Sequence, residues 1–189
     1  MRLWVMAICA VLTLGACVAP PVWAPDEAAA NAAYRDNSPP RLTLITMTGP
    51  GGSGVHTSLL INGSQRVIFD PAGSFTDALV PERHDVLFGI TPAALDRYID
   101  YHTAPEFNSI LMIQELDVSP EVAQAALRAV MSFGPVVGGK CSLSTSSVIA
   151  SLPGFGNIQP MWYPLKFSEK FGEISGVKTR TINRRTPVE

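Results

Sequence analysis

The dipeptide Asn62-Gly63 constrains the fold more than any other feature of the sequence. It separates two apolar runs, 55–61 and 65–70, and Asn-Gly between such runs is a strong signal for a β-hairpin. The two strands of a hairpin are antiparallel neighbours. The sequence therefore predicts an antiparallel sheet in which His56 opens one strand and Asp70 ends the next.

Helices alternate with further strands along the rest of the chain. We expect strands at 41–48, 107–118 and 177–182, and the continuously apolar centre of the second of these, 110–113, indicates a strand covered on both faces. Helices are expected to begin at Thr91-Pro92 and Ser119-Pro120, because a threonine or serine N-cap precedes a proline at the first helical position. Two more helices are expected at 141–152 and 164–174. The predicted class is α+β, and 189 residues suffice for one domain with a substantial core.

The N-terminus reads as a targeting segment. Arg2 precedes an apolar stretch, 3–14, that is too short to span a bilayer, and Leu14-Gly15-Ala16-Cys17 resembles the bacterial lipobox. We expect a signal peptide over 1–16, lipid attachment at Cys17, a flexible tether over 17–40, a folded domain over 41–182 and a tail over 183–189. The alternative is an ordinary secretory signal peptide. A lipidated Cys17 places the protein in the bacterial cell envelope, bound to the membrane through its lipid and facing the periplasm, and Val18 after it favours the outer membrane.

Processing of the N-terminus leaves Cys141 as the one free thiol of the mature chain, since the sequence holds three cysteines and Cys9 lies in the signal peptide. Gly138-Gly139 precedes it, and its predicted helix has an inward face on which Cys141 lies. A lone cysteine is either a small buried hydrophobe or a reactive thiol. Unpaired N–H groups at a helix start stabilise a thiolate, and they also stabilise the oxyanion that develops when a carbonyl is attacked. Together these features indicate acyl transfer through a thioester.

Three histidines are candidates for the base that such a thiol needs. His84 lies in a charged loop and His102 on an apolar helical face, positions typical of a solvated and a core histidine. His56 follows a glycine-rich loop and enters a strand whose partner ends in a carboxylate, so we expect it to be the base.

Asp70 is the candidate that orients His56, and the hairpin register decides whether it does so. A three-residue loop at 62–64 sets His56 opposite Asp70 on one face, whereas a two-residue Asn62-Gly63 turn directs Asp70 away. The alternative role of Asp70, before Pro71, is to cap a turn.

Other chemistries find less support. Ser142, Ser144, Ser146 and Ser147 invite a serine-nucleophile interpretation, but no Gly-x-Ser-x-Gly elbow occurs. A zinc site built from Cys141, His56 and an aspartate lacks the usual close-spaced ligand pair, so we expect no metal and no cofactor. The glycine-rich loop 49–54 lacks the ending of a phosphate-binding loop, and a net charge of −2 gives no footprint for nucleic acid.

Three short segments carry a resemblance: His56-Thr-Ser-Leu-Leu-Ile, Val67-Ile-Phe-Asp-Pro-Ala-Gly and Lys140-Cys141-Ser-Leu-Ser-Thr-Ser, with histidine before cysteine. Together they resemble the circularly permuted papain-like superfamily, in which the histidine also comes first and which includes NlpC-type peptidases and amidases and the lecithin–retinol acyltransferase-like proteins. The resemblance implies a papain-like fold in which the cysteine helix packs on an antiparallel sheet. It also implies Cys141 as nucleophile and His56 as base. Many members have a histidine as third residue, and this chain departs from them there, since Asp70 is its candidate.

These observations lead to an expected function. The chain is expected to be a membrane-anchored cysteine hydrolase or acyltransferase that acts on a peptide or acyl substrate, in first place on amide bonds of cell-wall peptides. The alternative is a non-catalytic lipoprotein that keeps the same fold as a binding or assembly module.

Overall fold

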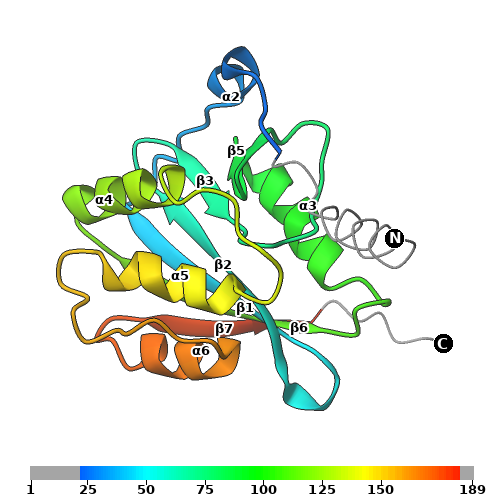
Figure 1. Cartoon of the computed structure of the whole chain (residues 1–189), viewed down its shortest axis with the longest axis vertical. Coiled ribbons are helices and arrows are strands. Elements are labelled where there is room, and N and C mark those ends of the chain that lie inside the picture. Colours follow the sequence, from blue (N-terminus) through cyan, green and yellow to red (C-terminus); the bar gives the residue numbers. More distant parts are fainter. Residues whose placement is uncertain (1–21, 184–189) are drawn as a thin grey trace, which may run out of the picture.

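Seven strands form one antiparallel sheet within residues 22–183, the part of the chain that the computed structural model describes (Figure 1). The sheet order is β4-β5-β3-β2-β1-β6-β7. Its strands are β1 (Arg41–Thr48), β2 (Gly54–Asn62), β3 (Arg66–Phe69), β4 (Glu82–Arg83), β5 (Val86–Phe88), β6 (Ile110–Asp117) and β7 (Lys178–Ile182). The α+β class and the antiparallel sheet agree with the sequence prediction.

Helices cover both faces of this sheet. In the described residues they are α2 (Asp26–Asn31), α3 (Pro92–His102), α4 (Pro120–Met131), α5 (Cys141–Ala150) and α6 (Pro164–Gly172), with one 3₁₀ turn at Pro50–Gly52. Figure 1 shows α4, α5 and α6 together on one face and α3 on the other.

The two faces hold separate apolar cores, and alternation along β2 connects them. Leu59 and Ile61 pack with α4, α5 and α6, whereas Leu60 packs with α3. The apolar centre of β6 is likewise covered on both sides. Leu111 lies in the α3 core, and Met112 Sδ accepts a hydrogen bond from Ser168 Oγ of α6 at 3.1 Å.

Two helix starts follow the predicted capping. Thr91 Oγ1 accepts the N–H of Ala94 at 3.1 Å, and Ser119 Oγ accepts that of Val122 at 3.4 Å. In contrast, no side chain caps the start of α5, whose N-cap residue is Lys140.

Residues 22–40 differ from the flexible tether that the sequence predicts. Residue Ala29 of α2 is buried against the core, Asp36 pairs with Arg66 of β3 at 2.8 Å, and the N–H of Ala24 donates to the carbonyl of Glu82. This segment therefore lies against the edge of the sheet formed by β4, a strand that the sequence analysis did not predict.

The predicted signal peptide and Cys17 lie outside the described residues, as does the predicted tail beyond residue 183. Within 22–183, no helix combines the length and the apolar character needed to cross a membrane.

Candidate active site

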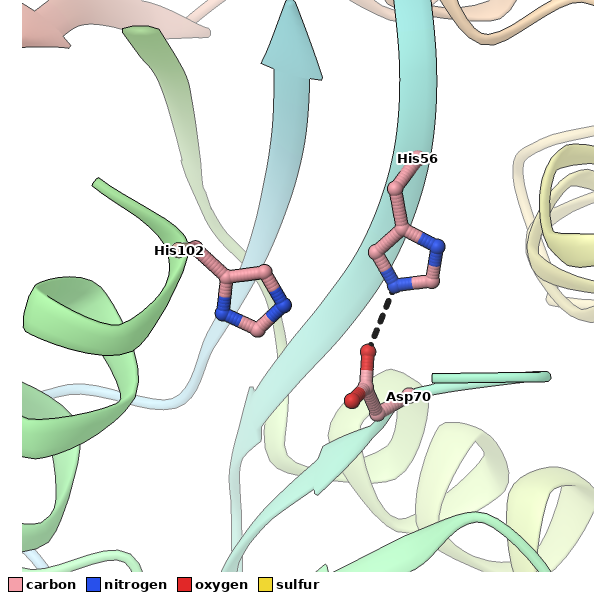
Figure 2. A group of neighbouring side chains, drawn as sticks. All are labelled: His56, Asp70 and His102. Carbon is pink, nitrogen blue, oxygen red and sulfur yellow. Dashed lines mark hydrogen bonds and ion pairs between the residues drawn. The ribbon is translucent and has the colours of Figure 1, made fainter. Parts of the chain in front are cut away.

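His56 and Asp70 meet beside the α3 face of the sheet. His56 Nε2 lies 2.6 Å from Asp70 Oδ1, with the His56 side chain 15% and the Asp70 side chain 3% exposed (Figure 2). Because Nε2 faces the carboxylate, the other ring nitrogen of His56, Nδ1, is left for a different partner.

The hairpin register that brings them together corrects the predicted one. Asn62 pairs with Arg66, so the loop comprises residues 63–65 instead of 62–64. The last pair is Leu59 with Phe69, which sets Ser58, two residues after His56, next to Asp70. Side chains two residues apart share a face, so His56 still lies on the same side as Asp70. The prediction that His56 and Asp70 share a face is therefore right. The prediction that His56 lies directly opposite Asp70 is wrong by two residues, because Ser58 takes that place.

Further contacts hold the Asp70 carboxylate. The Tyr98 hydroxyl of α3 donates to Asp70 Oδ1 at 2.8 Å and also lies 2.9 Å from Ser58 Oγ. The carboxylate folds over Gly73, and a Cβ at that glycine would overlap Asp70 Oδ2. A side chain at position 73 is therefore incompatible with this carboxylate orientation.

Cys141 is the first residue of α5, and three groups donate hydrogen bonds to its sulfur. These are the His56 imidazole and the backbone N–H groups of Thr57 and Ser142. Thr57 lies two residues before Leu59, the first residue of β2 that pairs with β3. Gly139, with φ of +80°, lets the chain turn into the helix in a backbone conformation that L side chains rarely adopt.

The electrostatics favour an ion pair between Cys141 and His56. Burial alone would lower the pKa of His56, but its hydrogen bonds to Asp70 and Cys141 and their negative charges raise it to about 10. Burial raises the pKa of the Cys141 thiol, and the hydrogen bond and charge of His56 outweigh burial, so that pKa is lowered. The pKa of Asp70 is also lowered, since His56 overcomes the effect of burial. The interactions of His56 with both partners thus favour a thiolate at Cys141, an imidazolium at His56 and a carboxylate at Asp70.

Asp85 ties the two loops of this site together. Its Oδ2 accepts the N–H of Val136, in the loop before Cys141, at 2.7 Å, and its Oδ1 accepts the N–H of Ala72, in the turn after Asp70, at 3.2 Å. Its carbonyl also accepts the N–H of Asp70 at 2.7 Å. Burial raises the pKa of Asp85 despite these hydrogen bonds. One carboxylate therefore fixes the spacing between the nucleophile loop and the Asp70 turn.

His102 is buried, as expected of a core histidine, yet it lies beside the site. It is 5% exposed, and its Nδ1 donates to the Tyr98 carbonyl at 2.9 Å. Its ring is parallel to that of His56 within 4°, with centroids 5.9 Å apart. Burial and the His56 charge lower its pKa. His102 follows Tyr98 by four residues, and this spacing places both side chains on one face of α3. From that face both approach Asp70.

The other sequence candidates lie elsewhere. His84 packs against Trp23, with ring centroids 4.7 Å apart, and is not part of this group. Among the serines of α5, Ser147 Oγ donates to the Leu143 carbonyl, and Ser146 Oγ accepts the Met161 N–H at 2.7 Å. These contacts agree with structural roles for those serines.

Two clefts involve residues next to the Cys141–His56 pair. One, of about 220 Å³, is lined by both His56 and His102 together with apolar and aromatic side chains, among them Met47, Val55, Tyr101 and Phe107. The other, of about 340 Å³, runs along α5 past Lys140 and Val137.

No protein family model, curated protein or solved structure matches this chain.

Proposed function

We propose that the chain is a cysteine hydrolase or acyltransferase that works through a thioester on Cys141. One observation carries the proposal: the His56 side chain contacts Asp70 through Nε2 and also hydrogen-bonds the Cys141 sulfur. A nucleophile, a base and a group that orients the base are what covalent acyl transfer requires.

The first half of the reaction forms the thioester. The Cys141 thiolate attacks the carbonyl carbon, and the carbonyl π electrons move to oxygen. The uncapped first turn of α5, including the Cys141 N–H, offers donors to that oxyanion. As the carbonyl reforms, the bond to the leaving group breaks, and the His56 imidazolium gives its proton to the departing nitrogen or oxygen.

The second half releases the product. Neutral His56 takes a proton from water or another acceptor, which attacks the thioester carbonyl. Collapse of this intermediate returns the thiolate, and His56 is left protonated as at the start. Asp70 stabilises the imidazolium and holds its ring through both halves.

A permuted papain-like fold is part of the proposal. It is supported by a cysteine helix that packs on an antiparallel sheet and by a histidine strand that precedes this helix in the chain. The proposed third residue is Asp70, where many members of that superfamily have a histidine.

Cell-wall peptides are the first proposed substrate class and other acyl compounds the second, on a protein held to the envelope membrane by lipid on Cys17. Support comes from the lipobox-like segment and from Lys140, a positive charge beside the nucleophile that suits a substrate carboxylate. The outer membrane is the proposed location, because the residue after the lipidated Cys17 is Val18.

The competing proposal is a non-catalytic module with the same fold, which the 8% exposure of Cys141 favours. The test is to incubate the chain with peptidoglycan fragments and with acyl esters, in wild-type form and as Cys141→Ser. Product from the wild type alone supports catalysis. Equal turnover by both forms contradicts catalysis by Cys141. The absence of turnover by either form, together with an unreactive Cys141 thiol, contradicts it as well.

A further inference from the structure

Three metal-ligand side chains from separate segments converge next to the nucleophile. His56 comes from β2, Asp70 follows β3, and His102 ends α3, yet their ligand atoms all lie within 4.8 Å of one another. Figure 2 shows the two imidazoles and the carboxylate pointing toward a common space.

The orientation of both rings suits a shared ion. His102 donates its Nδ1–H to the Tyr98 carbonyl, which leaves Nε2 as the nitrogen that carries a lone pair. Metal-bound histidines commonly make such a hydrogen bond with the other ring nitrogen. The ring centroids are 5.9 Å apart, close to the roughly 5–6 Å that two imidazoles adopt on one tetrahedral zinc with bonds of about 2 Å.

We propose that His56, Asp70 and His102 form a site for a divalent transition metal, with zinc as the best fit. Two imidazole nitrogens and one carboxylate oxygen make a three-ligand set with a fourth position open, as in mononuclear zinc sites. The cleft of about 220 Å³ touches both His56 and His102, so it gives the ion a route from solvent. On binding, the metal replaces the proton held between His56 Nε2 and Asp70, and that proton leaves to solvent.

The consequence for activity rests on the proposed function. A metal on His56 Nε2 separates the imidazole from Asp70 and prevents that nitrogen from binding a proton. His56 then no longer forms the imidazolium that protonates the leaving group. The metal is therefore an inhibitor, and the chain is active only when this site is free of metal.

The test measures binding without reference to activity. The full-length chain, without a polyhistidine tag and carrying Cys141→Ser so that no thiolate at this position contributes, is titrated with Zn²⁺ by calorimetry and with Co²⁺ by visible absorption. We expect one equivalent to bind at this site. Adding His102→Ala weakens that binding at least about 10-fold, because a ligand is lost. The matched control, His84→Ala, removes a histidine outside the cluster and leaves binding unchanged.

Two results overturn the inference: no zinc binding by the Cys141→Ser chain, or equal binding after His102→Ala. If His102→Ala fails to fold, His102→Asn keeps a donor for the Tyr98 carbonyl at the position of Nδ1, and unchanged zinc binding by that variant has the same meaning. A zinc-induced rise in the melting temperature of the Cys141→Ser chain is also expected, and its absence contradicts the site.

The two proposals fail in different ways. A reactive Cys141 in a chain that binds no zinc refutes the metal site and leaves the thioester mechanism standing. Zinc binding that depends on His102, in a chain whose Cys141 is unreactive, refutes the mechanism and leaves the metal site.

Discussion

Replacing Asp70 with asparagine tests how much of the Cys141 reactivity depends on the buried carboxylate. The Asp70 side chain is 3% exposed and lies 2.6 Å from His56 Nε2, so its charge acts on the imidazole with little screening. Asparagine keeps the shape of the side chain and an oxygen for the Tyr98 hydroxyl, but it removes the charge.

The expected magnitude follows from the charge that is lost. A close opposite charge shifts a pKa by about 1–3 units, which is about 1.4–4 kcal/mol. Without it the pKa of His56 falls toward its ordinary value and that of Cys141 rises, so less thiolate exists near pH 6. We expect alkylation of Cys141 by iodoacetamide at pH 6 to slow by about 10- to 1000-fold.

The assay follows the mass of the Cys141 peptide with time. Asp117→Asn is the matched control, since it removes a carboxylate that is half-exposed and paired with Arg41, and we expect it to react like the wild type. Near-UV circular dichroism must show that Asp70→Asn is folded, because an unfolded chain also alkylates slowly at this pH. A folded Asp70→Asn that reacts within about twofold of the wild type refutes the role of Asp70.

Three further predictions follow from the same geometry. Gly73→Ala forces the Asp70 carboxylate away from its position and slows alkylation as Asp70→Asn does, whereas Gly156→Ala, where a Cβ meets open space, has no effect. Asp85→Asn leaves one of two half-buried N–H groups without its acceptor and lowers the free energy of unfolding by about 1–3 kcal/mol in urea titrations. Cys17→Ser moves the protein from the membrane fraction to the soluble fraction of cells, as seen by immunoblotting.

Each of these has an opposing outcome. Normal alkylation by Gly73→Ala contradicts the packing of Asp70 over that glycine, and an unfolding midpoint of Asp85→Asn equal to the wild type contradicts its bridging role. Membrane retention of Cys17→Ser contradicts anchoring through lipid at that residue.

The elements that could be predicted from the sequence are those with strong local signals. The Asn62-Gly63 turn and the Ser/Thr-Pro helix starts are determined within a few residues, so the hairpin and the helices α3 and α4 could be predicted. The strands β4 and β5 could not, because two and three residues are too short to show alternation.

The site was predictable only in part for a similar reason. Cys141, His56 and Asp70 stand out by residue type and position, and the shared face of His56 and Asp70 follows from strand alternation. Tyr98 and His102 were hidden on an apolar helical face, where a core role is the ordinary interpretation. Asp85 acts through contacts to two distant loops, and such contacts leave no periodic pattern in the sequence.

The central claim is that Cys141 exists as a thiolate paired with His56, and the pH dependence of its alkylation tests that claim most directly. For the wild-type chain we predict that the rate falls less between pH 8.5 and pH 6 than that of a free thiol, because the pKa of the Cys141 thiol is lowered by His56, whose own pKa is raised to about 10. A rate that climbs about 10-fold per pH unit across that range, with its inflection at or above the free-thiol value of about 8.5, would contradict the account.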